Sequence, residues 1–252
     1  MGKFIANLAT AFVPIPKIRR RVRGVIRYWH PDLTLKKLFV KKTVYDCIFS
    51  LGEGCFTAQA LRHSRLRKFS GPFDWVMGSS LEKRIKFLTD DFRNFFDKGD
   101  FEFVMTGEKQ GNDFYTNKRT GLLYMHDFPA KGNFDIEFPA AKEKYERRIG
   151  RLLNLIESAN RALAVYADVK GTKYRTDKEI AGLFSKLRKK FGEKMDLLYV
   201  KSNPELKPSQ SKITYNERGL TIGEYFGNDS WGDKKHEISE KAFRKLCLFI
   251  KA

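Results

Sequence analysis

The sequence predicts an α/β fold in which helices cover both faces of a partly parallel sheet, a three-layer arrangement. The clearest pattern is a strand over 162–169, a helix that begins at the capping box Thr176-Asp177-Lys178-Glu179, and a second strand over 195–200. A strand–helix–strand unit of this length implies parallel pairing. A buried strand over 44–51 adds to the sheet, and Gly52-Glu53-Gly54 ends it before a helical pattern.

The remaining elements follow from hydrophobic periodicity and from turn residues. In chain order we expect a short helix over 81–88, a hairpin over 114–128, a long helix after Pro139, a hairpin over 212–224 and a C-terminal helix capped by Ser239. Together with the parallel unit, these elements predict one α/β domain over 43–252.

The first 42 residues form a separate basic arm. They carry eleven Lys or Arg residues and one acid, out of a formal net charge of +19 for the chain. Apolar residues over 4–29 recur at helical spacing with arginines between them, which favours an amphipathic helical arm on an anionic membrane surface. Two alternatives are a helix packed on the domain and a nucleic-acid contact. The second is disfavoured because no recognition motif accompanies the arm.

The three cysteines, Cys47, Cys55 and Cys247, include no CxxC motif and no Cys/His pair at metal spacing. This pattern favours a reducing compartment and predicts neither disulfides, a metal nor a cofactor. The charge-free stretch over 4–16 is too short to span a membrane and precedes the basic cluster, unlike a signal peptide. We therefore expect a cytoplasmic protein, peripheral at the inner membrane.

Cys55 is the candidate nucleophile because it stands at a helix entrance. Unpaired N–H groups and the helix dipole favour a thiolate there, so we expect a pKa below about 8.5. The same N–H groups can stabilise an oxyanion, and Gly52 and Gly54 let a substrate approach the backbone. The alternative is an ordinary small buried side chain, as we expect for Cys47 and Cys247.

A cysteine nucleophile also needs a base. His126 lies at the end of a predicted strand and ranks first. His236 ranks second, with Asp233 as its partner. His63 is two helical turns from Cys55, roughly 12 Å, which is too far.

The segment Ser50-Leu51-Gly52-Glu53-Gly54-Cys55, followed by Ser70-Gly71-Pro72-Phe73-Asp74-Trp75, resembles an uncharacterised bacterial family of papain-like cysteine peptidases. The similarity runs from about residue 44 to at least 203 and includes His126-Asp127-Phe128 and the basic helix at 145–148. The resemblance implies a Cys55 nucleophile and a His126 base, with Asp127 or Asp74 orienting the imidazole. Genes of the family tend to lie among surface-polysaccharide genes.

One feature departs from papain, which lacks the parallel, Rossmann-like layer predicted over 162–200. The strand–Gly–x–Cys–helix start also resembles a capsule-locus acetyltransferase family with an SGNH-like fold. The spacing of Asp233 and His236 is similar to the Asp-x-x-His pair of SGNH hydrolases. The two resemblances together suggest a Rossmann-like or SGNH-like arrangement with acyl chemistry on Cys55.

The leading hypothesis is a thiol-dependent acyl-transfer enzyme, either a hydrolase or an acyltransferase. It would act on a glycan or glycolipid of bacterial surface-polysaccharide biosynthesis, with Gly52, Gly54, Trp75 and Arg147 contacting the substrate. One alternative is a glycosyltransferase or sugar-phosphate enzyme, although the sequence has no Asp-x-Asp and no P-loop. Another is a non-catalytic, membrane-associated assembly factor that works through the arm.

Overall fold

The computed structural model describes residues 41–169, 175–227 and 234–252, with Pro16, Ile18, Arg19 and Val22 of the preceding segment. The basic arm predicted over 1–42, and its membrane contact over 4–29, therefore lie almost entirely outside the described residues. Asp233 also lies outside them. Among the described residues, no helix carries an apolar stretch long enough to cross a membrane.

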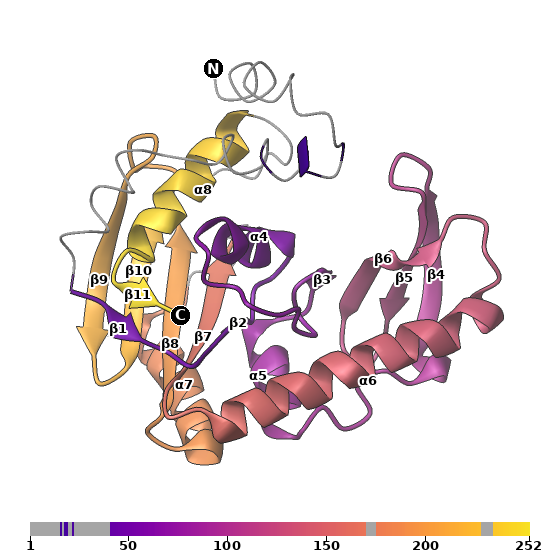
Figure 1. Ribbon diagram of the computed structural model, residues 1–252, viewed down its shortest axis with the longest axis horizontal. Helices are drawn as coiled ribbons and strands as arrows, with labels where there is room; N and C mark the ends of the chain where they lie inside the picture. Colours follow the sequence, from indigo (N-terminus) through magenta and orange to yellow (C-terminus); the bar gives the residue numbers. More distant parts are fainter. Residues whose placement is uncertain (1–15, 17, 20–21, 23–40, 170–174, 228–233) are drawn as a thin grey trace.

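The main sheet has the strand order β2-β7-β8-β10-β9 (Figure 1). Four strands are parallel to one another, and β9 is antiparallel to β10. The bounds are β2 (Cys47–Ser50), β7 (Ala162–Asp168), β8 (Met195–Ser202), β9 (Ser211–Glu217) and β10 (Leu220–Tyr225). The predicted α/β class with a partly parallel sheet is confirmed, as are the strand–helix–strand unit and the second hairpin.

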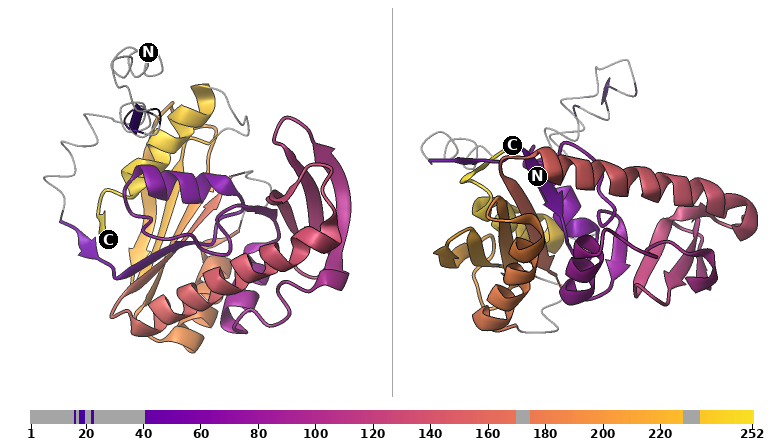
Figure 2. Two further views of the ribbon diagram at one scale, coloured as in Figure 1. Left: turned by 45° about the vertical axis from the view of Figure 1, so that its right-hand side comes forward. Right: turned by 90° about the horizontal axis from the view of Figure 1, so that it is seen from below.

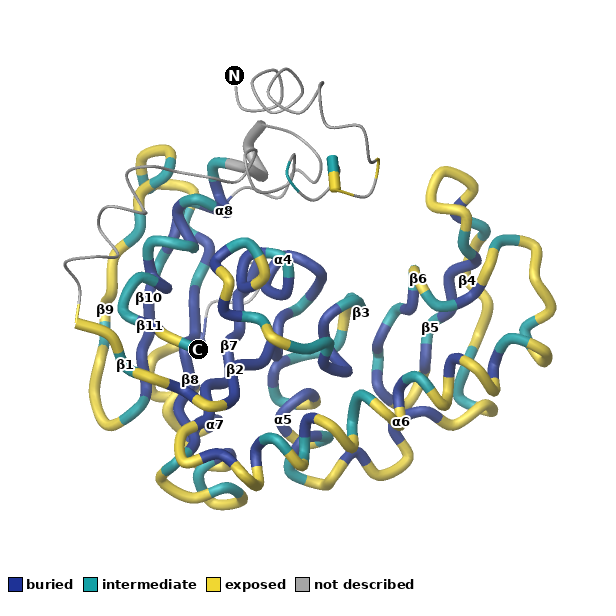
Figure 3. The backbone as a smooth tube through the Cα atoms, in the orientation of Figure 1, coloured by how far each residue is buried: buried dark blue, intermediate teal, exposed yellow. Residues whose placement is uncertain are grey.

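Helices pack on both faces of this sheet because successive side chains of a strand point to opposite sides. Ile48 and Val165 face α4 (Cys55–His63) and α8 (Lys234–Leu246), whereas Phe49 and Tyr166 belong to the core on the opposite side. That second core includes α5 (Leu81–Thr89) and α7 (Asp177–Phe191). Figure 3 shows the buried strands between these layers.

The capping box predicted at the start of α7 is present, with Thr176 as N-cap and Glu179 as its partner. The predicted C-terminal helix differs at its start. The helix α8 begins at Lys234, so Ser239 lies inside it, buried, and is not its N-cap.

A second sheet, antiparallel, has the order β3-β6-β5-β4 and lies beside the first (Figures 1 and 2). Its bounds are β3 (Val76–Gly78), β4 (Phe101–Gly107), β5 (Asn112–Asn117) and β6 (Leu122–Pro129). The expected hairpin is β5–β6, but β4 was not foreseen because its apolar residues do not alternate. The remaining short elements are β1 (Thr43–Val44), paired with β11 (Ile250–Lys251), and the turn η1 (Lys98–Asp100).

The long helix α6 (Phe134–Ser158) runs along both sheets (Figure 1). It begins earlier than predicted, because the side chain of Asn133 accepts hydrogen bonds from the N–H groups of Asp135 and Ile136. Pro139 therefore lies inside the helix. The Phe-rich segment before β4 packs on α6, where the Phe96 ring stacks 4.6 Å from that of Tyr145.

Candidate active site

Cys55 is the first residue of α4, and a tight turn after β2 sets its position. The Gly52 N–H donates to Ser50 Oγ at 3.0 Å. A Cβ on Gly52 would lie 2.2 Å from Thr57 Oγ1, so only glycine fits there. The N-cap, Gly54, is extended and supplies no side-chain cap to the first N–H groups of the helix.

His126 reaches Cys55 from the second sheet because β6 bulges at this position. Asp113 pairs with Phe128 and Tyr115 pairs with Tyr124, so three residues of β6 face the single residue Phe114. Bulges re-aim side chains and are common beside active sites. The Nε2 atom of His126 lies 3.9 Å from Cys55 Sγ, although the two residues are 71 positions apart.

Trp75 lies against the exposed imidazole of His126. The two rings meet edge to face, with centroids 6.5 Å apart and an interplanar angle of 88°. The indole also lies near Arg67, whose guanidinium carbon is 5.4 Å from the ring centroid. The indole thus lies beside the His126 imidazole, and the substrate contact expected from the sequence stays a prediction.

The carboxylates of Asp74 and Asp127 lie close enough to act on the Cys55 thiol electrostatically. Asp127 accepts a hydrogen bond from Tyr145 Oη at 3.0 Å and pairs with Lys144 Nζ at 2.5 Å. Asp74 accepts from Arg67 Nε at 2.7 Å and from the Gly71 N–H at 2.9 Å. In the described structure each carboxylate is thus held by a cation and a second donor, and neither is hydrogen-bonded to His126.

The ionisation of Cys55 differs from the sequence prediction. Burial is the main cause that raises the pKa of its thiol to about 11, and Asp74 and Asp127 raise it further. Its own backbone N–H lowers the pKa but does not reverse the effect. The predicted lowering considered only the helix terminus. Because the side chain is 7% exposed, loss of hydration outweighs the dipole, and the thiol is protonated at neutral pH.

Arg147 does not reach this site. It is exposed on α6 and pairs with Glu143 at 3.0 Å. Its neighbour Arg148 faces inward, 5.3 Å from the ring centroid of Tyr145, and lowers the pKa of Asp74, which burial raises. The sequence analysis did not single out Arg67, Lys144 and Arg148 as parts of the site. The spacing of residues 144 and 148 predicts that they share one face of a helix, but it does not predict which side chains they contact.

The other histidines have different surroundings. His63 pairs with Glu240 of α8 at 2.9 Å, at the far end of α4 from Cys55. His236 lies in α8, and its predicted partner Asp233 is outside the described residues. The prediction that His236 is an alternative general base, with Asp233 as its partner, therefore stays a prediction.

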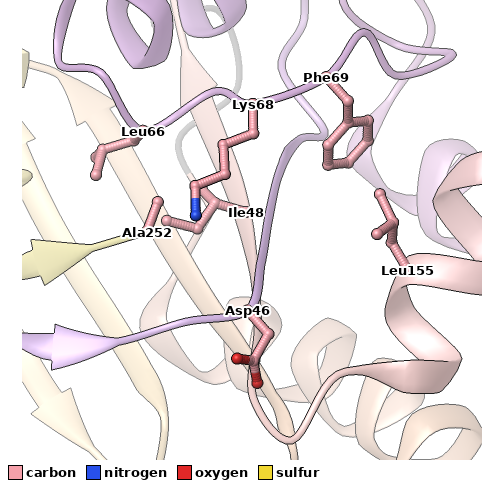
Figure 4. A pocket seen from close by; sticks show the side chains of 7 residues that line it. All are labelled: Asp46, Ile48, Leu66, Lys68, Phe69, Leu155 and Ala252. Carbon is pink, nitrogen blue, oxygen red and sulfur yellow. The ribbon is translucent and has the colours of Figure 1, made fainter.

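One cavity near the start of β2, of about 260 Å³, is separate from these residues (Figure 4). Apolar side chains such as Ile48, Leu66 and Leu155 line it, together with Asp46 and Lys68. Within the described ranges, no group of three or more His, Cys, Asp or Glu side chains is arranged to hold a metal ion.

A thiol at a helix entrance that faces an imidazole is the arrangement of a cysteine-dependent hydrolase. Residues 46–201 match the family model described as "Putative papain-like cysteine peptidase (DUF1796)", and the chain belongs to this family. Cys55, Asp74, His126 and Asp127 all lie within the matched segment. The predicted family is therefore confirmed.

An uncharacterized protein of Acanthamoeba polyphaga mimivirus is 27% identical over 146 residues. The match covers 51% of this chain and 65% of that relative. No solved structure matches the chain significantly, so the Rossmann-like or SGNH-like assignment stays a prediction. These comparisons do not test the bacterial and surface-polysaccharide association, which stays a prediction.

Proposed function

We propose that the protein is a cysteine hydrolase in which Cys55 attacks a carbonyl carbon and His126 transfers the proton. The main support is the 3.9 Å separation of Sγ and Nε2, which brings together residues from two different sheets. The separation is long for a hydrogen bond, as catalytic contacts often are before substrate binds. The exposed imidazole leaves room for this contact to shorten.

The raised pKa of the thiol determines the order of events. The proton leaves Sγ for His126 Nε2 as the C–S bond forms, because the free thiolate is scarce at neutral pH. The carbonyl oxygen becomes an oxyanion, and the uncapped N–H groups at the start of α4 are the nearest donors for it. Collapse expels the leaving group, which takes the proton from His126. Water then repeats the sequence on the thioester and frees the acid.

Asp74 and Asp127 support this transfer through their charge. Their negative field raises the pKa of the Cys55 thiol and disfavours a free thiolate, which favours proton transfer in the same step as the attack. Tyr145 and Lys144 hold Asp127 in place, and Arg67 holds Asp74. Trp75 restricts the imidazole by its edge contact.

The proposal extends to the acyl acceptor and to the class of substrate. Water as acceptor gives a hydrolase, and a hydroxyl of a glycan or glycolipid gives an acyltransferase by the same steps. The basic sequence of residues 1–42 supports a role beside an anionic membrane, where such a glycolipid would be found. The same sequence is the basis for a peripheral location at the cytoplasmic face.

The test is to trap the acyl-enzyme. The full chain is incubated with p-nitrophenyl esters of several acyl groups, and the adduct is located by intact mass and peptide mapping. We expect acylation at Cys55, none with Cys55→Ala, and a rate reduced about 10²–10⁴-fold with His126→Gln. Cys47→Ala, which removes another buried free thiol, should acylate normally. Acylation elsewhere, or an unchanged rate in His126→Gln, would contradict the proposal.

A further inference from the structure

A second cavity, of about 400 Å³, lies at the carboxyl ends of the parallel strands. Glu53, from the turn after β2, and Asp168, the last residue of β7, form part of its wall. The start of α5 forms another part, through Ser79, Ser80 and Lys83. Open α/β sheets bind ligands outside the carboxyl ends of their strands, so this is where a ligand is expected.

The cavity lies close to Cys55, although neither Cys55 nor His126 lines it. Glu53 is two residues from Cys55, which limits the distance between their Cα atoms to roughly 7 Å. Gly121, in the turn between β5 and β6, also lines the cavity, and β6 carries His126. A substrate that occupies the cavity can therefore place its carbonyl group at Cys55.

Two serines, Ser79 and Ser80, lie at the start of α5 and differ in their hydrogen bonds. The buried Oγ of Ser79 has no hydrogen-bond partner within the described residues. Its backbone is in the left-handed region, with φ +63°, which a serine adopts only when the surrounding structure holds it there. Ser80 caps α5 by accepting from the Lys83 N–H at 3.3 Å, and its hydroxyl is hydrogen-bonded to the Glu82 carboxylate.

Two cations of α5 accompany these hydroxyls. Lys83 is exposed and has no ion pair in the part of the chain that the structure describes, and its Nζ would lie 3.7 Å from a Cβ on Gly121. Arg84 is fully buried behind the wall and donates to the Gly78 carbonyl oxygen at 2.6 Å. Its Nε and Nη1 atoms have no acceptor among the described residues. Glu53 interacts electrostatically with this guanidinium and the centroid of the Phe73 ring lies 5.2 Å from its central carbon, so the buried positive charge is partly compensated.

The acidic residues of the wall lie near compensating groups. Glu53 interacts electrostatically with Arg84. Asp168 accepts from Tyr199 Oη at 3.5 Å, and this hydroxyl accepts from Arg175 Nη1 at 3.4 Å. Both oxygens of Glu82 in turn bind Arg175, at 2.9 and 3.0 Å. The Lys83 end of the cavity is therefore its positive end.

We propose that this end of the cavity binds an anionic group, a carboxylate or a phosphate, carried by the substrate of Cys55. The inference rests on the proposed function for its link to the nucleophile, but the anion site is a property of the cavity alone. The N-terminus of α5 adds its dipole to the charge of Lys83 and to the hydroxyl of Ser79. The protein then selects acyl compounds with a negative charge near the bond that breaks.

The first experiment measures anion binding to the full chain by calorimetry, with inorganic phosphate and with succinate at one fixed ionic strength. Fixed ionic strength matters because a chain of net charge +19 attracts all anions. We expect one of the two anions to bind about 10-fold more weakly to Lys83→Met than to the unchanged protein. Lys86→Met, an exposed lysine on the same helix, is the matched control and should bind normally. Equal binding by the two variants, or no binding of either anion, would overturn the inference.

The second experiment links the anion site to Cys55. Alkylation of Cys55 by bromoacetyl-β-alanine is compared with alkylation by its neutral amide, and the rate ratio is followed by peptide mapping. The carboxylate reagent should be favoured, and the ratio should fall several-fold in Lys83→Met but not in Lys86→Met. If Lys83→Met leaves this rate ratio unchanged while Cys55 is still acylated normally, the proposed hydrolase function stands. The proposed selection of anionic substrates is then refuted. If anions bind at Lys83 but Cys55 is not acylated, the anion site is supported and the proposed hydrolase function is refuted.

Discussion

Raising the pH should reveal that burial governs the ionisation of Cys55. Its side chain is 7% exposed, and burial together with Asp74 and Asp127 raises the pKa of the thiol to about 11. A free cysteine titrates near ~8.5, so it has a few per cent of thiolate at pH 7. With a pKa of about 11, the thiolate fraction at pH 7 is on the order of 10⁻⁴. Alkylation of Cys55 should be correspondingly slow at neutral pH.

The assay follows the rate of iodoacetamide labelling of Cys55 by peptide mapping from neutral pH to about pH 11, with circular dichroism at each pH to verify folding. The rate should rise about tenfold per pH unit and show no plateau near ~8.5. Cys47, in the core with a pKa raised to about 12, is an internal comparison and should react more slowly. Asp74→Asn removes one nearby negative charge and should move the Cys55 profile to lower pH.

The same shift predicts how stability depends on pH. The pKa of Cys55 in the folded protein, about 11, exceeds the ordinary thiol value of 9.0, so the native state retains this proton longer than the unfolded chain does. Its contribution to stability is complete below pH 9 and is lost as the pH rises toward 11. A labelling profile that levels off at or below pH ~8.5 would refute the reasoning and restore the thiolate predicted from the helix terminus.

Three substitutions test the surrounding structure. Gly52→Ala should destabilise the fold by about 1–3 kcal/mol in urea unfolding, because its Cβ overlaps Thr57; Gly182→Ala, with open space around it, should not destabilise. Tyr145→Phe keeps the stacked ring but removes a donor to Asp127, and it should cost about 1–3 kcal/mol and slow acylation of Cys55. Arg67→Met leaves the Asp74 carboxylate buried without its cation and should cost about 3–5 kcal/mol, a loss that Asp74→Asn in the same chain should partly restore. Unchanged unfolding midpoints in all three variants would show that these contacts do not hold the site.

Local sequence patterns were enough to predict much of the main sheet. The glycine turn before Cys55 and the capping box at Thr176 are complete within a few residues, so their structures follow from chain geometry. The start of α6 was placed too late because Pro139 was taken as a helix beginning, whereas Asn133 caps the helix upstream. β4 was missed because Val104 breaks the alternation of Phe101, Phe103 and Met105 with polar residues.

The candidate site was predictable only in part. Cys55 and His126 stand out by residue type and by position, but the bulge that turns His126 toward Cys55 depends on the register between β5 and β6. The ion pair of Asp127 with Lys144 depends on how α6 crosses the second sheet. The pKa of Cys55 was expected in the wrong direction, because the loss of hydration around a side chain depends on the assembled fold.

The helix α6 has 25 residues and therefore extends over roughly 37 Å, long enough to contact both sheets (Figure 2). It holds Asp127, next to the base, while packing beneath β2, which leads to the nucleophile. The distance between the Cys55 sulfur and the His126 imidazole is thus fixed by one continuous helix and not by loops. Strands at the outer edge of the second sheet can consequently diverge in length or composition without altering the reacting pair.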